Sequence, residues 1–306
     1  MDRIQTENLC YSYEQARYNA LDGISFVAHE HERIAVLGPN GAGKSTLFKH
    51  FNGILLPTAG SILIDGESIT KKNLHAIRRK VGLVFQHADD QIFSSTVEQD
   101  IAFGPHNLGL SEEDVAQRVD SVVHMLALED LRDRAPHRLS GGEKNRVAIA
   151  GILAMIPEVL FLYEPTAGLD PTGVGELFEF LNSLPETLGC TVIYSTHQVE
   201  LVPETADRIY VMEHGRITGE GTPDEIFMQA DLLRSARLEL PPLLKLTAAL
   251  REAGIDITTS TRYQDVEDSL LSAFGKTPRK HDDRHEPAHI HGGFGSHPHF
   301  HPHSEQ

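Results

Sequence analysis

The sequence predicts an α/β protein built on a mainly parallel β-sheet, and three observations lead to this class. Short apolar runs typical of buried strands recur at residues 34–37, 81–85, 159–163 and 191–194. Helical stretches separate these runs. A glycine-rich loop follows the first run and precedes a helical stretch from Leu47 onward. Strands that alternate with helices are typical of a parallel sheet covered on both faces.

The N-terminal part is expected to be antiparallel instead. Residues 8–28 predict a strand pair with its turn at Asp22-Gly23, and residues 62–66 predict a second hairpin, because Asp-Gly favours tight reversal. Residues 88–150 are expected to be largely helical.

The chain is predicted to divide into three parts. A large domain covers residues 1–225, an accessory segment covers 226–278, and a tail covers 279–306. The accessory segment contains an amphipathic stretch that is broken at Pro241-Pro242. The tail is polar and rich in His, Gly and Pro, so it is expected to be disordered.

The composition argues against several classes of function. Lys and Arg number 27 against 44 Asp and Glu, giving a net charge of −17, so nucleic acid is not an expected partner. The longest apolar run, residues 147–156, is much shorter than the ~20 residues of a spanning helix. Any membrane association is therefore expected to come through another subunit. Cys10 and Cys190 form no metal-ligand or redox spacing and are predicted to be reduced thiols of a cytosolic protein.

The glycine-rich loop fits the phosphate-binding pattern G-x-x-x-x-G-K-[ST]. It consists of Gly38, Pro39, Asn40, Gly41, Ala42, Gly43, Lys44, Ser45 and Thr46. Its glycines let backbone N–H groups converge on phosphate oxygens, and the following helix points its positive N-terminus at the same anion. Lys44 is expected to reach the β- and γ-phosphates, and the Ser45 hydroxyl to ligate Mg²⁺. The loop therefore predicts a P-loop NTPase.

A second loop, Leu139-Ser140-Gly141-Gly142-Glu143, lies about a hundred residues later. Together the two loops resemble the ATP-binding subunit of an ABC transporter, over residues 3–225. The resemblance implies a RecA-like core, an antiparallel β subdomain and a helical subdomain that carries the second loop, called the signature loop below. It also implies a head-to-tail pair of subunits, in which Ser140, Gly141 and Gly142 of one cap the ATP held by the other.

Five further residues match the family's site. Tyr13 matches the aromatic residue that stacks on adenine; a buried strand residue is the alternative. Gln86 matches the glutamine that contacts Mg²⁺ and senses the membrane subunit. Glu164 matches the general base that polarises the attacking water. His197 matches the switch histidine that contacts the γ-phosphate, and Asp170 matches the loop that joins the two active sites.

The segment from Gln86 through Asp89-Asp90-Gln91-Ile92-Phe93 to Ala102-Phe103-Gly104 resembles the energy-coupling-factor branch, which includes cobalt and nickel importers. The branch implies Mg²⁺-dependent ATP hydrolysis coupled to transport. It also implies a peripheral position on the cytoplasmic face of the cell membrane. The implied partners are a second ATP-binding subunit, identical or paralogous, a transmembrane coupling subunit and a substrate-binding membrane subunit.

One position departs from the family. The strand that ends at Leu162 runs into Tyr163-Glu164, where the family has Asp-Glu. That Asp holds Mg²⁺, mostly through water, and orients Ser45, and a neutral phenol cannot supply its charge. We expect ATP binding to be retained and hydrolysis to be sharply reduced. Three explanations are open: a degenerate site beside a competent partner, a single substitution, or compensation by Asp170 or Glu164. The intact state of the other motifs favours the second.

The tail contains eight histidines, four of them at every second position. They are His281, His285, His289, His291, His297, His299, His301 and His303. Alternate positions lie on one side of an extended strand, and imidazole binds cobalt, nickel, zinc and copper well. One hypothesis is that the last six of these histidines buffer or sense transported cobalt or nickel. The other is a solvated tail without function.

Two rival functions are considered. A non-transport ABC ATPase usually carries coiled-coil insertions or tandem ATPase domains, and this sequence has neither. A non-hydrolysing, ATP-dependent regulatory or metal-binding protein would fit Tyr163. Co-purification with membrane proteins would favour the importer over both.

Overall fold

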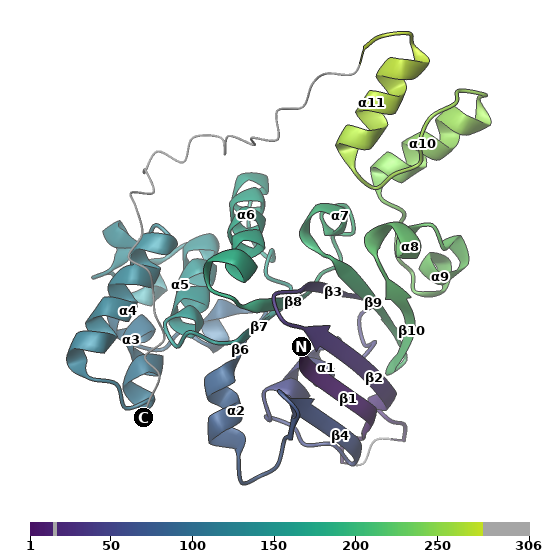
Figure 1. The fold of residues 1–306 in the computed structure, drawn as a ribbon. Coiled ribbons are helices and arrows are strands. Elements are labelled where there is room, and N and C mark those ends of the chain that lie inside the picture. The colour runs from purple at the N-terminus through teal and green to yellow at the C-terminus, as the bar shows by residue number, and fades with distance from the viewer. Residues whose placement is uncertain (15–16, 278–306) are drawn as a thin grey trace.

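The computed structural model describes residues 1–14 and 17–277, and the strands within these ranges form two sheets (Figure 1). The smaller sheet is antiparallel, with the order β2-β1-β4-β5, and consists of β1 (Asp2–Tyr11), β2 (Leu21–His29), β4 (Ala59–Ile64) and β5 (Glu67–Ser68). The larger sheet has the order β10-β9-β3-β8-β7-β6 and consists of β3 (Arg33–Leu37), β6 (Val81–Val84), β7 (Val159–Tyr163), β8 (Thr191–Ser195), β9 (Arg208–Glu213) and β10 (Arg216–Gly221). Its pairings are parallel except that of β9 with β10. The predicted α/β class is confirmed.

Two groups of helices lie beside the sheets, and further helices follow later in the chain (Figure 1). Near the glycine-rich loop and the smaller sheet lie α1 (Lys44–Phe51) and α2 (Leu74–Lys80). The helical region beyond β6 contains the 3₁₀ turn η1 (Ala88–Asp90), α3 (Val97–Asn107), α4 (Glu112–Met125), η2 (Glu129–Leu131), η3 (Pro136–Arg138) and α5 (Gly141–Leu153). The remaining helices are α6 (Pro171–Thr187), α7 (Val202–Thr205), α8 (Pro223–Phe227), α9 (Ala230–Ser235), α10 (Pro242–Glu252) and α11 (Tyr263–Ala273). Of these, α10 and α11 project from the rest of the chain.

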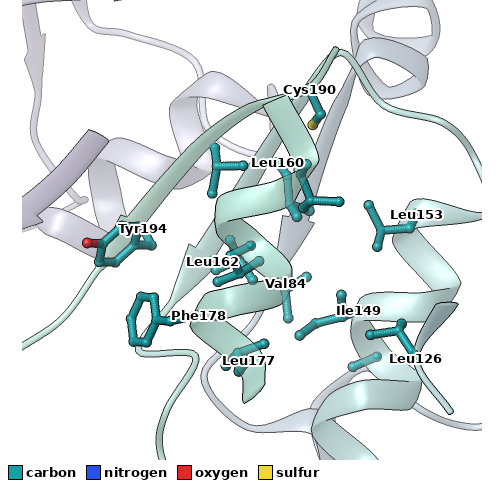
Figure 2. Close-up of a cluster of buried hydrophobic side chains, with 14 of the residues drawn as sticks. Val84, Leu126, Ile149, Leu153, Leu160, Leu162, Leu177, Phe178, Cys190 and Tyr194 are labelled. Atoms are coloured by element: carbon teal, nitrogen blue, oxygen red, sulfur yellow. The ribbon is translucent and has the colours of Figure 1, made fainter. Parts of the chain in front are cut away.

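The central parallel strands are buried on both faces, and their residues alternate between two hydrophobic cores. On β7, Leu160 and Leu162 belong to one core, and Val159 and Phe161 belong to the other. Figure 2 shows Leu160 and Leu162 among side chains that include Ile149 of α5 and others from α6. This two-sided burial explains why the apolar runs are continuous and do not alternate with polar residues.

The second core lies between the larger sheet, α1 and the smaller sheet. Phe161 packs on two phenylalanines of α1, with ring centroids 5.1 Å from Phe48 and 5.0 Å from Phe51. By the same alternation, the side chain of Tyr163 lies on the α1 face of the sheet, and it packs against this second core.

The predicted turn at Asp22-Gly23 is wrong. Both residues lie inside β2, and residues 12–20 connect the two strands. The β1–β2 register is irregular at this point, since Leu9 pairs with Ile24 but Tyr11 pairs with Leu21. The Asp-Gly pair therefore marks a bulge within a strand and not its reversal. The second Asp-Gly pair does form a turn, between β4 and β5.

The accessory segment contains α9, α10 and α11, joined by non-helical stretches, and Pro241-Pro242 falls at the start of α10. It is attached to α8 through Thr261, whose hydroxyl and backbone N–H donate to Asp224. Within the described ranges, we find no helix with the length and apolarity that crossing a bilayer demands. The eight tail histidines lie outside the described residues. The division of the chain into three parts stays a prediction.

Candidate nucleotide-binding and hydrolysis site

The phosphate-binding loop joins β3 to α1 along a path that only glycine can follow at two positions. Gly38 and Gly43 have φ angles of 143° and 108°. A Cβ at Gly38 would lie 2.2 Å from the carbonyl oxygen of Met212, and one at Gly43 would lie 2.7 Å from that of Ala20. The loop backbone therefore runs directly against β9 and against the segment before β2.

The turn between β9 and β10 supports the loop from the other side. The Gly215 N–H donates to the Ala42 carbonyl at 2.9 Å, and the Asp22 N–H donates to the Gly215 carbonyl at 2.8 Å. These bonds connect the loop, the β9–β10 turn and β2, so three segments that are distant in sequence fix the shape of one anion cradle.

The Lys44 side chain is held inside this loop. It is only 4% exposed, and its Nζ donates to the carbonyls of Gly38 at 2.6 Å and Pro39 at 3.2 Å. Burial lowers the pKa of Lys44, and the negative charge of Glu164 opposes that shift. A phosphate entering the loop offers this ammonium group a charged acceptor in place of neutral carbonyls.

A pocket of about 640 Å³, within the size range of ligand sites, opens in front of the loop. The predicted site residues that line it are Tyr13, Gly41, Ala42, Gly43, Lys44, Ser45 and Thr46, together with Tyr163. The sequence did not indicate the other lining residues, which are Tyr18, Asn19, Ala20, Asp22, His214 and Gly215. They belong to the β1–β2 connection, the start of β2 and the β9–β10 turn, which carry no recognisable motif.

Tyr13 lies in the wall of this pocket. Its side chain is 44% exposed, and its hydroxyl lies 3.1 Å from the Thr46 hydroxyl. Its ring meets the Tyr11 ring edge to face, with centroids 4.9 Å apart. The alternative that Tyr13 is a buried strand residue is therefore wrong, because it lies beyond the end of β1 and faces the pocket.

Tyr163 also reaches the pocket, from the end of β7. It is half-buried and shares the pocket wall with Lys44 and Ser45. A phenol therefore lines the same pocket as the predicted Mg²⁺ ligand Ser45, at the position where the resemblance implies a carboxylate.

Glu164 and His197 lie together at the carboxyl ends of adjacent strands. Glu164 follows β7, is 5% exposed and has a left-handed φ of 48°. Its N–H donates to the Ser195 carbonyl at 3.1 Å, and its Oε2 lies 2.8 Å from Nδ1 of His197. The predicted general base and the predicted switch histidine thus form a hydrogen-bonded pair.

The signature loop forms the start of α5. Ser140 is the N-cap and accepts a hydrogen bond from the Glu143 N–H, while the Glu143 carboxylate accepts one from the Ser140 N–H. This backbone hydrogen bond is the largest cause of the lowered pKa of Glu143. Ser140, Gly141 and Gly142 lie outside the set of residues that line the nucleotide pocket of their own chain.

The other predicted residues outside that pocket lining are Gly38, Pro39, Asn40, Gln86, Glu164, Asp170 and His197. Asp170 is the N-cap of α6, where it accepts a hydrogen bond from the Gly173 N–H at 2.7 Å. Gln86 is exposed on the segment after β6. The contact of Gln86 with Mg²⁺ therefore stays a prediction.

Comparison with known proteins agrees with this geometry. The sequence pattern of the ABC transporter family matches residues 21–167. The energy-coupling factor transporter ATP-binding protein EcfA of Methanoculleus marisnigri is 56% identical over 276 residues, which cover 90% of this chain and 99% of that protein. EcfA1 of Methanospirillum hungatei is 57% identical, with the same coverage of both chains. The chain belongs to the energy-coupling factor transporter ATP-binding proteins of the ABC family.

Two solved structures are also similar to this energy-coupling factor ATPase. CbiO1 of Clostridium perfringens, part of the ABC transporter complex cbiONQ, has a TM-score of 0.71 and 42% identity over 82% of this chain and 99% of its own. The dimeric post-hydrolysis state of the cassette MJ0796, bound to ADP and phosphate, has a TM-score of 0.66 and 28% identity over 72% of this chain and 98% of its own. The predicted family, the P-loop NTPase fold and an ATPase activity coupled to transport are thereby confirmed.

The glycine constraint in the phosphate loop yields a direct test. Gly43→Ala should weaken ATP binding by about 5- to 150-fold, because the new Cβ meets the Ala20 carbonyl at a φ that costs about 1–3 kcal/mol. Titration with a fluorescent ATP analogue measures the affinity. Gly175→Ala, in the open face of α6, is the matched control and should bind ATP like the parent chain. Equal affinities for all three proteins would contradict the proposed role of the loop.

Proposed function

We propose that this chain is the peripheral, ATP-hydrolysing subunit of an energy-coupling factor importer, on the cytoplasmic face of the cell membrane, and that its cargo is cobalt or nickel. The observation that carries the proposal is the Glu164–His197 pair, whose Oε2 and Nδ1 atoms lie 2.8 Å apart. Glu164 follows β7 and His197 follows β8, and β8 lies between β7 and β3, the strand that leads into the phosphate loop. This arrangement supports hydrolysis of the γ-phosphate. The names of the relatives support the transport role.

In the proposed mechanism, Tyr13 stacks on the adenine and the loop amides hold the phosphates. Lys44 exchanges the carbonyls of Gly38 and Pro39 for phosphate oxygens. The site residues suited to Mg²⁺ are Ser45 and Gln86, and the ion would neutralise phosphate charge there. Glu164 then accepts a proton from the attacking water, and His197 orients the γ-phosphate.

A second ATP-binding subunit completes the site in this proposal. Ser140, Gly141 and Gly142 do not line the pocket at the phosphate loop of their own chain, but they stand at the N-terminus of a 13-residue helix, which favours an anion. We infer that they cap the nucleotide of the partner in a head-to-tail pair. The dimeric state of the cassette MJ0796 supports this arrangement.

A groove of about 570 Å³ between α2, α3 and α5 is proposed to receive the membrane subunit. Its wall includes Gln91 and Phe93, which follow Gln86 closely in the sequence. Phe93 and Phe103 are 66% and 47% exposed and meet edge to face, with centroids 4.7 Å apart. Exposed aromatic pairs in a concave surface are typical of protein interfaces.

Phe103→Glu should therefore reduce association with the membrane coupling subunit by at least about 30-fold, the size expected when a central aromatic contact is lost. Quantitative co-purification from detergent extracts measures the association, and ATP binding should stay at the parent level. Phe274→Glu is the matched control, since Phe274 is equally an exposed phenylalanine but lies at the end of α11. If both variants retain the membrane subunit, the groove is not its docking site.

We further propose that Tyr163 slows hydrolysis. The side chain lines the same pocket as Ser45, and its neutral phenol supplies no charge to support the metal. Loss of a metal-supporting partner typically lowers metal affinity or activity by about 10- to 100-fold. The other motifs are intact, so ATP binding should persist.

Tyr163→Asp should accordingly raise the steady-state rate of Mg-ATP hydrolysis by about 10- to 100-fold, with ATP affinity nearly unchanged. Tyr163→Phe is the matched control: it removes only the hydroxyl and should hydrolyse ATP at the parent rate. Equal rates for Tyr163→Asp and the parent chain would show that another group supports the metal. A faster Tyr163→Asp variant would also argue against the rival function of a non-hydrolysing regulatory or metal-binding protein.

The choice of cargo rests on the residues of the energy-coupling-factor segment and on the histidine-rich tail. Removal of residues 281–306 takes away the eight tail histidines, so tight Ni²⁺ binding to the isolated subunit should be lost while ATP binding is kept. Calorimetric titration with Ni²⁺ measures this. Unchanged Ni²⁺ binding would contradict a metal-handling role of the tail.

A further inference from the structure

The first turn of α5 is attached to two functional segments by adjacent side chains. Lys144 projects toward η1, where its Nζ lies 2.6 Å from Oδ1 of Asp89. Its side chain is 20% exposed, whereas that of Asp89 is 75% exposed. Asp89 belongs to the segment that follows Gln86, so this ion pair connects that segment to the turn that carries the signature loop.

Asn145 connects the same turn to the segment after β7 that carries Glu164 and Pro165. Its Nδ2 donates to the carbonyl of Pro165 at 2.5 Å, and Pro165 directly follows Glu164. Among the described residues, its Oδ1 is buried without a hydrogen-bond partner. Consecutive helical residues point about 100° apart, which explains how Lys144 and Asn145 reach different neighbours from one turn.

Gln91 extends the connection into the groove. Its Oε1 accepts a hydrogen bond from the Phe85 N–H at 3.1 Å, and its Nε2 donates to the Ala148 carbonyl of α5 at 3.4 Å. Gln91 also lines the groove between α2, α3 and α5. The Gln91 side chain therefore contacts the groove proposed for the membrane subunit, the residue after β6 and helix α5.

We propose that the first turn of α5 relays occupancy of the groove to the hydrolytic carboxylate, with Lys144 and Asn145 as positioning residues. This proposal rests on the proposed function. A helix in the groove displaces the segment of residues 86–91, and the Lys144–Asp89 pair moves the first turn of α5 with it. Because Ser140 caps that turn, the signature loop moves too, and Asn145 shifts the peptide after Glu164.

Hydrogen exchange of the full chain, alone and in complex with its membrane coupling subunit, tests the relay. In the parent complex, exchange in residues 139–147 and 163–167 should change by on the order of tenfold relative to the free chain, a coupling of ordinary size. Lys144→Glu, which repels Asp89, should remove both responses. The charge exchange that combines Lys144→Glu with Asp89→Lys should restore them, which a merely structural effect of Lys144→Glu would not.

Asn145→Asp separates the two halves of the relay. It is nearly isosteric but lacks the donor to the Pro165 carbonyl, so residues 139–147 should still respond while residues 163–167 do not. ATP affinity and thermal unfolding of each variant, compared with the parent, identify proteins that are simply misfolded. If the parent complex forms but neither segment responds, or if Lys144→Glu responds like the parent, the relay is overturned. If no complex forms, the proposed function fails first, and the relay with it.

Discussion

The close passage of the phosphate loop against two other backbones is the constraint on which the rest of this structure depends. Gly38 and Gly43 leave room only for a hydrogen where the carbonyls of Met212 and Ala20 approach. The loop can keep its shape only if β9 and the segment before β2 are in place. An intact anion cradle is therefore a property of the assembled fold, although its motif is local in sequence.

Burial of the central sheet on both faces gives position 163 its importance. A strand that is covered on both sides offers no exposed face, so each side chain must enter one of the two cores or the site at the strand's end. Along β7 the alternation sends Phe161 to the aromatic rings of α1 and Tyr163 to the pocket in front of that helix. A change at this position cannot be absorbed at the surface.

Local signals allowed much of the fold and part of the site to be predicted from sequence. The apolar runs identified the parallel strands, and the glycine pattern located the strand, loop and helix around Lys44. The turn predicted at Asp22-Gly23 was wrong because Asp-Gly suits both a turn and a bulge within a strand. Only the pairing with the neighbouring strand distinguishes the two.

Features that depend on tertiary neighbours could not be predicted in this way. The motifs indicated Glu164 and His197 separately, but their contact requires β7 and β8 to be adjacent, with Tyr163 beside Ser195. His214 and Asn19 reach the pocket from a turn and a connection without a motif. The groove between α2, α3 and α5 exists only after three distant helices have packed.

The left-handed backbone of Glu164 has a consequence for how such a chain can evolve. A glutamate with a φ of 48° holds a conformation that glycine or asparagine adopts at lower cost. Heat adaptation acting on this residue alone would favour one of those two, and either would remove the carboxylate. With Glu164 as the proposed general base, thermal robustness and turnover select in opposite directions at this single position, so lineages that keep hydrolysis must gain their heat tolerance elsewhere in the fold.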